Sequence, residues 1–109
     1  MMMMVADAAL EEMAARLVRD FQPEKIILFG SRARGDALPD SDFDLLIIGA
    51  WAGSRHETAA KMYRSLLGLG VAKDLVLVTP EEFEADKHYP GTVSRPAWLE
   101  GRVLYDRAA

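Results

Sequence analysis

The sequence predicts a single domain that combines helices and strands. Its fold class is α/β in the broad sense that includes α+β, with helices packed on a small mixed β-sheet. Amphipathic stretches with three- and four-residue spacing alternate with short apolar runs, a pattern that indicates helices and buried strands. The 109 residues are the usual size of one domain, so residues 1–109 are expected to form one unit. The connection from Ile48 to Asp74 is long enough for a parallel crossover. The connection from Leu28 to Asp42 is short for a covering helix, so the sheet is expected to be mixed.

The first half of the chain predicts one helix and two strands. Ala8–Phe21 has apolar residues at helical spacing, and Pro23 is expected to stop this helix. Lys25–Phe29 is an apolar run typical of a strand covered on both faces. Ser31–Ser41 is polar and predicts a helical turn, capped by its first serine, that continues as a loop. Asp42–Ile48 begins with alternation and ends apolar, which predicts a central strand whose first end reaches the rim of the sheet.

The second half predicts two or three helices and two further strands. Glu57–Leu69 has helical apolar spacing, and Asp74–Thr79 follows as a strand. Pro80 stands at a plausible first helical position before two glutamates, which predicts a short helix. Ser94–Gly101 predicts one or two helical turns, and Arg102–Tyr105 a last short strand.

Composition excludes several classes of protein. Thirteen Lys and Arg against seventeen Asp and Glu give a net charge of -4, which argues against extended nucleic-acid binding through a basic face. Without cysteine there is no disulfide, thiolate nucleophile or Cys-type zinc site. The longest apolar or glycine stretch, Leu45–Gly53, is about half of a membrane-spanning helix. Met1–Met4 is not followed by the pattern of a secretory leader, so a cytoplasmic location with no membrane partner is expected.

The first candidate site is a turn after the strand predicted at residues 25–29. Gly30 and Ser31 stand where this strand ends and a helix begins, and such a junction points free backbone N–H groups at one place. Gly30 lets the backbone approach an anion without a Cβ in the way, and Ser31 adds a hydroxyl. Arg32 and Arg34 are near enough in sequence to reach the same anion. These four residues are the candidate nucleotide-binding residues.

The second candidate site is a group of three acids. Asp42 and Asp44 are two apart on a predicted strand, so their side chains leave the same face with Cα atoms roughly 6.5–7 Å apart. Two such carboxylates repel, and a divalent ion such as Mg²⁺ relieves the conflict. Asp74 begins the next core strand, where it can stand beside the other two. Three acids beside a phosphate-binding turn are what two-metal phosphoryl or nucleotidyl transfer requires.

Each pattern taken alone also has a structural explanation as a turn, a solvated rim or surface charge. Other readings of the same residues fail. Asp40, Asp42 and Asp44 alternate like the first ligands of an EF-hand, but Leu45 and Trp51 stand where that loop needs Gly and Glu. The chain has neither the Gly-Lys-Ser/Thr end of a P-loop nor a Gly-x-Gly-x-x-Gly after a strand.

Other side chains with catalytic potential are expected to be structural. No clear Ser–His–acid grouping supports nucleophilic catalysis. His56 and His88 are far apart without a third ligand, which predicts surface positions. Packing is predicted for Trp51, Tyr63 and Trp98 rather than base stacking.

The motif as a whole resembles a known family. Gly30-Ser31, ten residues, then Asp42-x-Asp44 is similar to the signature of nucleotidyltransferases of the DNA polymerase beta superfamily. The fuller wording GSRARGDALPDSDFDLLI and the ending LEGRVLYD resemble the minimal nucleotidyltransferases, commonly antitoxins paired with a helical HEPN ribonuclease toxin. The likeness runs from Ile26 to Thr79 and implies the nucleotidyltransferase fold.

The resemblance also implies a role for each matched residue. Gly30 and Ser31 would hold the nucleotide triphosphate, with ATP as the substrate. Asp42 and Asp44 would bind two Mg²⁺ ions, and Asp74 would complete the metal site and activate the attacking hydroxyl. In toxin–antitoxin members the acceptor is a tyrosine of the HEPN toxin, which receives AMP while pyrophosphate is released.

Two other functions remain open from the sequence. A non-catalytic antitoxin would mask its toxin by binding alone, but it would have no need of three like charges at Asp42, Asp44 and Asp74. Transfer to a small molecule such as an aminoglycoside would need an acceptor pocket that a chain of this size has little material to build. A protein adenylyltransferase is the preferred hypothesis.

Overall fold

This computed structural model describes residues 5–109, and side chains from residue 8 onward. The initial Met1–Met4, for which the sequence predicts no chemistry, lies outside the described residues. Within the described part, no helix has the length and apolar character needed to cross a membrane.

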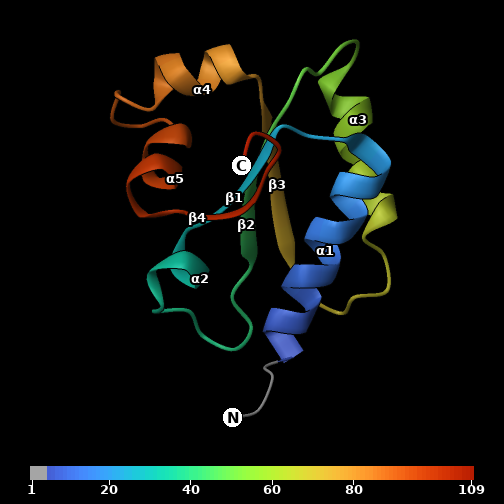
Figure 1. The fold of residues 1–109 in the computed structure, drawn as a ribbon. Helices are drawn as coiled ribbons and strands as arrows, with labels where there is room; N and C mark the ends of the chain where they lie inside the picture. Colours follow the sequence, from blue (N-terminus) through green and yellow to red (C-terminus); the bar gives the residue numbers. More distant parts are fainter. Residues whose placement is uncertain (1–4) are drawn as a thin grey trace.

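A four-stranded sheet in the order β3-β2-β1-β4 forms the middle of the protein (Figure 1). The strands are β1 (Lys25–Phe29), β2 (Phe43–Ile48), β3 (Lys73–Val78) and β4 (Arg102–Asp106). β2 pairs antiparallel with β1 and parallel with β3, while β1 pairs antiparallel with β4. The expectation of a small mixed sheet with one parallel crossover is confirmed.

Helices cover both faces of this sheet (Figure 1). The long helix α1 (Val5–Phe21) and α3 (Arg55–Ser65) lie on one face, and the short helices α4 (Pro80–Asp86) and α5 (Ser94–Glu100) lie on the other. α2 (Ser31–Arg34) is a single turn at the end of β1. The protein therefore has three layers, with the sheet in the middle.

Apolar side chains fill both spaces between the sheet and its helices. The larger cluster lies toward α1 and α3 and contains Leu10, Met13, Leu17, Ile26, Leu28, Phe43, Leu45, Ile47, Met62, Leu66, Leu75 and Leu77. The smaller cluster lies toward α4 and α5 and contains Ile27, Leu46, Ile48, Phe83 and Ala97. Successive residues of β1 and β2 alternate between the two clusters, which explains why both strands are almost continuously apolar.

Two predicted helices have different bounds in the structure. α1 begins at Val5, three residues before the predicted start, and ends as predicted before Pro23. The helix predicted over Glu57–Leu69 is α3, which begins after its cap, Ser54, and already ends at Ser65. Apolar spacing continues past this end because residues of the following turn still pack on the core. These residues include Leu66 and Leu69.

The short C-terminal elements agree closely with the prediction. Pro80 is at the start of α4, where Thr79 and Glu82 form a reciprocal capping box: each side chain accepts a hydrogen bond from the other residue's backbone N–H. α5 and β4 occupy the segments predicted as Ser94–Gly101 and Arg102–Tyr105.

Candidate active site

Strand register brings the predicted acids to one end of the sheet, the lower end in Figure 1. Asp44 is the direct partner of Asp74 in the parallel pair β2–β3 and of Phe29 in the antiparallel pair β1–β2. Asp42 was expected inside the strand but lies one residue before it, because β2 begins at Phe43. It is still two residues from Asp44 and so is expected on the same side of the chain. The structure therefore brings Asp44 and Asp74 together and places Asp42 next to them.

The face that carries these acids is the one covered further along by α4 and α5. Alternation puts Asp44 on the same face as Leu46, which belongs to the smaller apolar cluster. Asp44 is half-buried, whereas Asp42 and Asp74 are exposed. The group therefore borders the apolar core on one side and solvent on the other.

Gly30 makes a close approach to Asp44 that no other residue permits. Its backbone has φ 75° and ψ -158°, a conformation that essentially only glycine adopts. A Cβ built at this position would overlap the Asp44 carboxylate oxygen Oδ2 and lie 3.2 Å from its Cγ. The turn after β1 and the acid on β2 are therefore in direct contact, as one combined site requires.

The electrostatics of Asp44 reflect its neighbours. Burial raises the pKa of the Asp44 carboxyl, and the negative charges of Asp74 and Asp42 raise it further. The guanidinium of Arg34 acts in the opposite direction and lowers the same pKa. Asp74, Asp42 and Arg34 therefore all lie within electrostatic reach of Asp44.

The donor atoms suit Mg²⁺. Among residues 8–109, no three Asp, Glu, His or Cys side chains are already close enough together to form a metal-binding group. The carboxylates beside Asp44 are nevertheless hard oxygen donors of the kind Mg²⁺ prefers. Their mutual repulsion, visible in the raised pKa of Asp44, is what a divalent cation would relieve. These residues therefore fit the cation by chemistry, and sharing an ion would require the side chains to converge.

The two arginines predicted to bind nucleotide have different surroundings. The Arg32 guanidinium donates hydrogen bonds to the backbone carbonyls of Pro39 and Ser41 and lies over the Phe43 ring. Arg34 is partly exposed and forms ion pairs with nearby acids. Its partners are Asp36 at 3.3 Å and Glu100 at 4.0 Å. Of the two, Arg34 is the one whose charge acts on Asp44, and the nucleotide-binding role of both stays a prediction.

Ser31 was expected to cap the short helix, and this is wrong. Gly30 is the N-cap of α2, no side chain caps this helix, and Ser31 is its first residue. The cap position has a backbone conformation that serine does not adopt, and glycine therefore occupies it. The Ser31 hydroxyl is therefore not used as a helix cap, and its predicted contact with a phosphate is unaffected.

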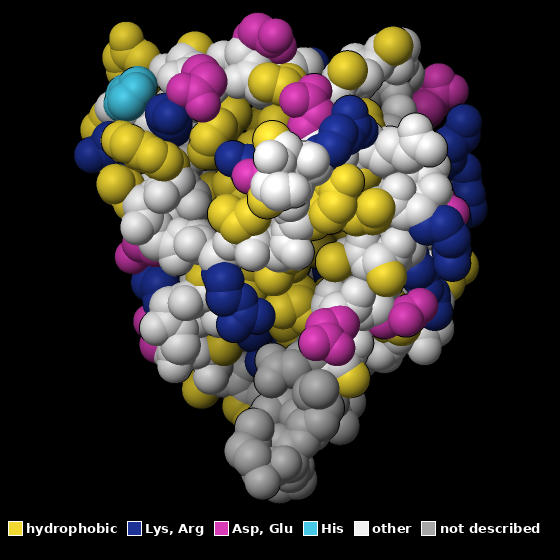
Figure 2. All heavy atoms as spheres, viewed as in Figure 1, with side chains coloured by type: hydrophobic (Ala, Val, Ile, Leu, Met, Phe, Trp, Pro, Cys, Tyr) yellow, Lys and Arg dark blue, Asp and Glu magenta, His cyan; other side chains and the backbone are white. Residues whose placement is uncertain are grey.

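Most other side chains singled out in the sequence lie at the surface or in packing contacts, as predicted. His56 and His88 are exposed. The Trp51 indole donates to the backbone oxygen of Ile47, and the Tyr63 hydroxyl accepts a hydrogen bond from the backbone of Leu75. The remaining tryptophan, at position 98, is 42% exposed and packs on surface side chains rather than in the core. On the face drawn in Figure 2, Lys and Arg side chains are interspersed with Asp and Glu.

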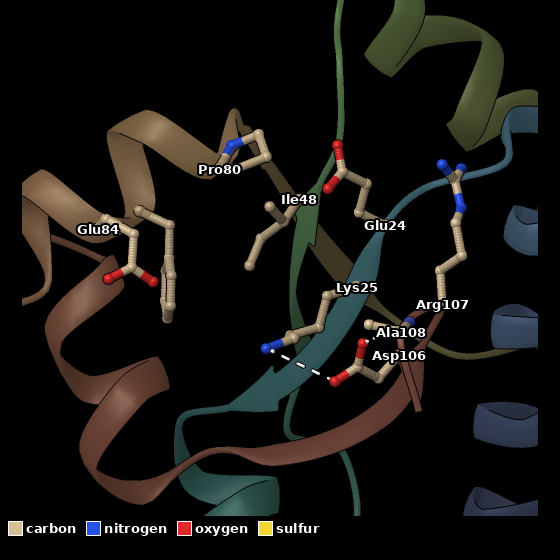
Figure 3. Close-up of a pocket in the computed structure, with 9 residues that line it drawn as sticks. Glu24, Lys25, Ile48, Pro80, Glu84, Asp106, Arg107 and Ala108 are labelled. Carbon is tan, nitrogen blue, oxygen red and sulfur yellow. Dashed lines mark hydrogen bonds and ion pairs between the residues drawn. The ribbon is translucent and has the colours of Figure 1, made fainter.

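A cavity of about 410 Å³ lies at the opposite end of the sheet (Figure 3). The register pair Lys25 and Ile48 contributes to its wall, whereas Asp44 pairs with the last residue of β1 at the other end. Across the cavity, Phe83 comes from α4 and Arg107 from the C-terminal segment. Lys25 is paired with Asp106 at 3.7 Å. This cavity is separate from the acids and was not foreseen from the sequence, which has no motif there.

Fold and site together define a nucleotidyl-transfer domain: a mixed sheet with a Gly-Ser turn after β1 and aspartates on the paired strands β2 and β3. The chain belongs to the nucleotidyltransferase domain family, whose model matches residues 10–105. A relative from Methanocaldococcus jannaschii, provisionally named a protein adenylyltransferase, is 38% identical over 82 residues. The match covers 75% of this chain and 78% of the relative. The predicted class, a nucleotidyltransferase enzyme resembling the minimal nucleotidyltransferases, is confirmed.

Solved structures share the fold. A provisionally named nucleotidyltransferase from Sulfolobus solfataricus is similar with a TM-score of 0.65 and 22% identity, covering 93% of this chain and 80% of that one. A toxin–antitoxin crystallised with AMP-PNP gives a TM-score of 0.56 at 24% identity, covering 88% and 73%. A mutant of the MntA–HpeT toxin–antitoxin gives 0.57 at 23% identity, with the same coverage. At these identities the similarity concerns the fold, and it confirms the predicted nucleotidyltransferase fold.

The contact between Gly30 and Asp44 is tested with Gly30→Ala and Gly35→Ala. Gly35 has φ 87° and open space around it, so alanine there adds only backbone strain of roughly 1–2 kcal/mol. Gly30→Ala adds the overlap with the Asp44 carboxylate to a larger backbone strain, so it should lower the free energy of unfolding by clearly more. Urea denaturation of both variants measures this. Similar losses in both would show that the close approach is not a constraint.

The raised pKa of Asp44 predicts a pH-dependent stability. Because the folded-state pKa lies above the unfolded one, the wild type carries a penalty above the folded pKa that disappears below the unfolded pKa. Asp44→Asn should therefore raise the melting temperature at pH 7 in metal-free buffer, and the gain should shrink as the pH falls toward the ordinary pKa of aspartate.

Asp20 supplies the control of opposite sign. Hydrogen bonds from Arg19 and Ser65 lower the pKa of Asp20 to about 2. Its charge therefore stabilises the fold at pH 7, and Asp20→Asn should lower the melting temperature there. The comparison is made by thermal unfolding of both variants from about pH 3 to pH 7, an interval that extends from roughly the ordinary pKa range of carboxyl groups to neutral pH. A clear loss of stability at pH 7 in Asp44→Asn would mean that this acid supports the fold instead of repelling its neighbours.

Proposed function

We propose that this chain is a Mg²⁺-dependent adenylyltransferase that acts as an antitoxin by transferring AMP from ATP to a tyrosine of a partner HEPN-type toxin. The observation that carries the proposal is the register that sets Asp44 opposite Asp74 and in contact with Gly30. The provisional name of the Methanocaldococcus jannaschii relative supports adenylyl transfer to a protein. The toxin–antitoxin structures, one of them with AMP-PNP, support an ATP-like substrate and a toxin partner.

Each side chain has a chemical role in this proposal. Gly30 lets the backbone reach the triphosphate, and Ser31 offers a hydroxyl to a phosphate oxygen. Arg34 brings positive charge, as its effect on Asp44 indicates. Asp42, Asp44 and Asp74 would hold Mg²⁺, with two ions expected. When bound, the metal would supply positive charge that polarises the triphosphate.

The bond changes of the proposed reaction are those of an in-line substitution. The tyrosine oxygen of the acceptor forms a bond to the α-phosphorus of ATP, and the bond from that phosphorus to the bridging oxygen of the β-phosphate breaks. Pyrophosphate leaves with the bond electrons, and the hydroxyl proton goes to Asp74. Because Asp74 is exposed, a hydroxyl that arrives from another protein can reach it.

The partner is expected to complete the site. The acids border solvent, and the cavity shown in Figure 3 lies at the far end of the sheet. Transfer rates depend steeply on how the acceptor is oriented. A small domain that holds phosphates at its edge therefore needs a second surface to orient the acceptor, and the isolated chain should be a slow enzyme.

Nucleotide binding is the first test. ATP titrated calorimetrically into the wild type should bind in the presence of MgCl₂ and much more weakly in EDTA. Asp42→Asn and Asp44→Asn should weaken the Mg²⁺-dependent affinity by more than about tenfold, because each removes a metal ligand. Asp40→Asn changes an exposed acid of the preceding loop and is the control. Equal, metal-independent binding by all four proteins would refute the metal site.

Transfer to a partner is the second test. The chain is mixed with a cognate HEPN-type protein, ATP and MgCl₂, and the partner should gain the mass of one AMP, located on a tyrosine by peptide mass spectrometry. Asp74→Asn should abolish the gain without dissociating the complex. A partner that stays unmodified yet is inhibited equally by the parent and the Asp74→Asn chain would favour the masking antitoxin. AMP transfer to an aminoglycoside instead would favour the small-molecule enzyme.

A further inference from the structure

The loop that delivers Asp42 has few internal contacts. Residues 35–42 connect α2 to β2, and most of them are exposed. Leu38 and Ser41 form its one local turn: the Leu38 amide donates to the Ser41 hydroxyl at 2.8 Å, and the Ser41 amide donates to the Leu38 oxygen at 3.0 Å. Leu38, the largest apolar side chain of the loop, is 67% exposed, so it does not anchor the loop in the core. An exposed polar loop of this length needs another constraint if it is to hold a carboxylate in one place.

Arg32 supplies that constraint from inside α2. Its Nη2 donates to the backbone oxygens of Pro39 at 3.0 Å and Ser41 at 2.9 Å, and its Nε donates to the same Ser41 oxygen at 3.2 Å. The guanidinium carbon lies 4.4 Å from the centre of the Phe43 ring, which is buried in the larger apolar cluster. Arg32 therefore contacts both chain neighbours of Asp42: it donates hydrogen bonds to Ser41 and lies over the ring of Phe43.

We propose that Arg32 is a positioning residue that holds Asp42 at the site, and that it does not itself bind the nucleotide. The guanidinium is planar, so it can donate along two directions in its plane while its face rests on an aromatic ring. Arg32 uses its N–H groups for hydrogen bonds to backbone oxygens and its face for the contact with Phe43, so the guanidinium is directed at the protein itself. The consequence for activity rests on the proposed function, in which Asp42 holds Mg²⁺, whereas the constraint on the loop is independent of it.

The neighbouring Arg34 shows the contrast. It has the same side chain two residues further along, yet its partners are the carboxylates of Asp36 and Glu100, and its charge lowers the pKa of Asp44. The two arginines of one short helix therefore have separate tasks. Arg32 organises the loop, and Arg34 contributes charge to the site.

The test compares Arg32→Ala, Arg32→Lys and Arg16→Ala. Arg16 is a matched control, because its guanidinium also donates to two backbone oxygens, those of Ser65 and Leu67, which lie outside the loop of residues 35–42. Hydrogen exchange of the free proteins reports on the loop, chiefly through the hydrogen-bonded amides of Leu38 and Ser41. Calorimetry with ATP and MgCl₂ reports on the site, and thermal unfolding identifies any variant that has lost its fold.

Both Arg32 variants should exchange about tenfold faster or more in residues 38–43 and should lose about tenfold or more in ATP affinity, while Arg16→Ala changes neither. Arg32→Lys should show the same changes as Arg32→Ala, because an ammonium group lacks the planar set of N–H donors that binds two carbonyls and cannot stack flat on the ring. If Arg32 instead contacts a phosphate, Arg32→Lys should retain most of the affinity, and exchange in the loop should be unchanged in both variants. That result would overturn the proposal.

The two measurements also separate this proposal from the proposed function. Exchange is measured without nucleotide, so it decides whether Arg32 holds the loop even if the wild type fails to bind ATP. Failure of the wild type to bind ATP with MgCl₂ would refute the proposed function alone. Unchanged loop exchange in Arg32→Ala would refute the positioning role, whatever the affinity.

Discussion

The parallel pairing of β2 with β3 is the constraint on which the site depends. It sets Asp44 opposite Asp74, and the antiparallel pairing of β2 with β1 sets the same Asp44 beside the turn at Gly30. A slip of one residue would turn Asp44 to the other face of the sheet and bring Leu45 in its place. The slip is prevented by the core, because β2 buries side chains alternately against two helical layers. Packing of the apolar residues along the strand, including the chain neighbours of the acids, therefore fixes the geometry of the acids.

The site is electrostatically unfavourable by itself. Asp44 is partly removed from water and faces two further negative charges, which together raise its pKa. The burial of the two apolar clusters compensates for this unfavourable free energy, and the charge of Arg34 offsets part of the repulsion. Stability that is given up at one end of a sheet in this way is typical of sites whose charges serve a ligand.

Local sequence patterns predicted what local forces decide. The apolar run Lys25–Phe29 matches β1 at both ends because burial on two faces leaves a continuous signal, and Pro80 marks the start of α4 because its fixed φ suits a first helical turn. The end of α3 was missed because Leu66 and Leu69 keep packing on the core after the helix has ended. Apolar spacing indicates which residues are buried, and here the buried residues continue beyond the end of the helix.

The candidate site shows the same division. Spacing was enough to group Asp42 and Asp44, and the order of the strands was enough to add Asp74. The surroundings of Arg32 could not be read from the chain, because its partners are backbone carbonyls seven and nine residues away that carry no side-chain signature. The cap of α2 was missed because the steric demand on Gly30 comes from Asp44, on another strand.

The exposure of Asp42 and Asp74 has a consequence for selectivity. An enzyme can favour one acceptor over water in two ways, by enclosing the reaction or by holding the acceptor in place. Two exposed acids at the rim of a sheet are open to water and do not themselves enclose the reaction. Under the proposed function, discrimination against hydrolysis would then rest on the residence and orientation of the acceptor, so the surface that binds a partner would also protect the nucleotide from hydrolysis.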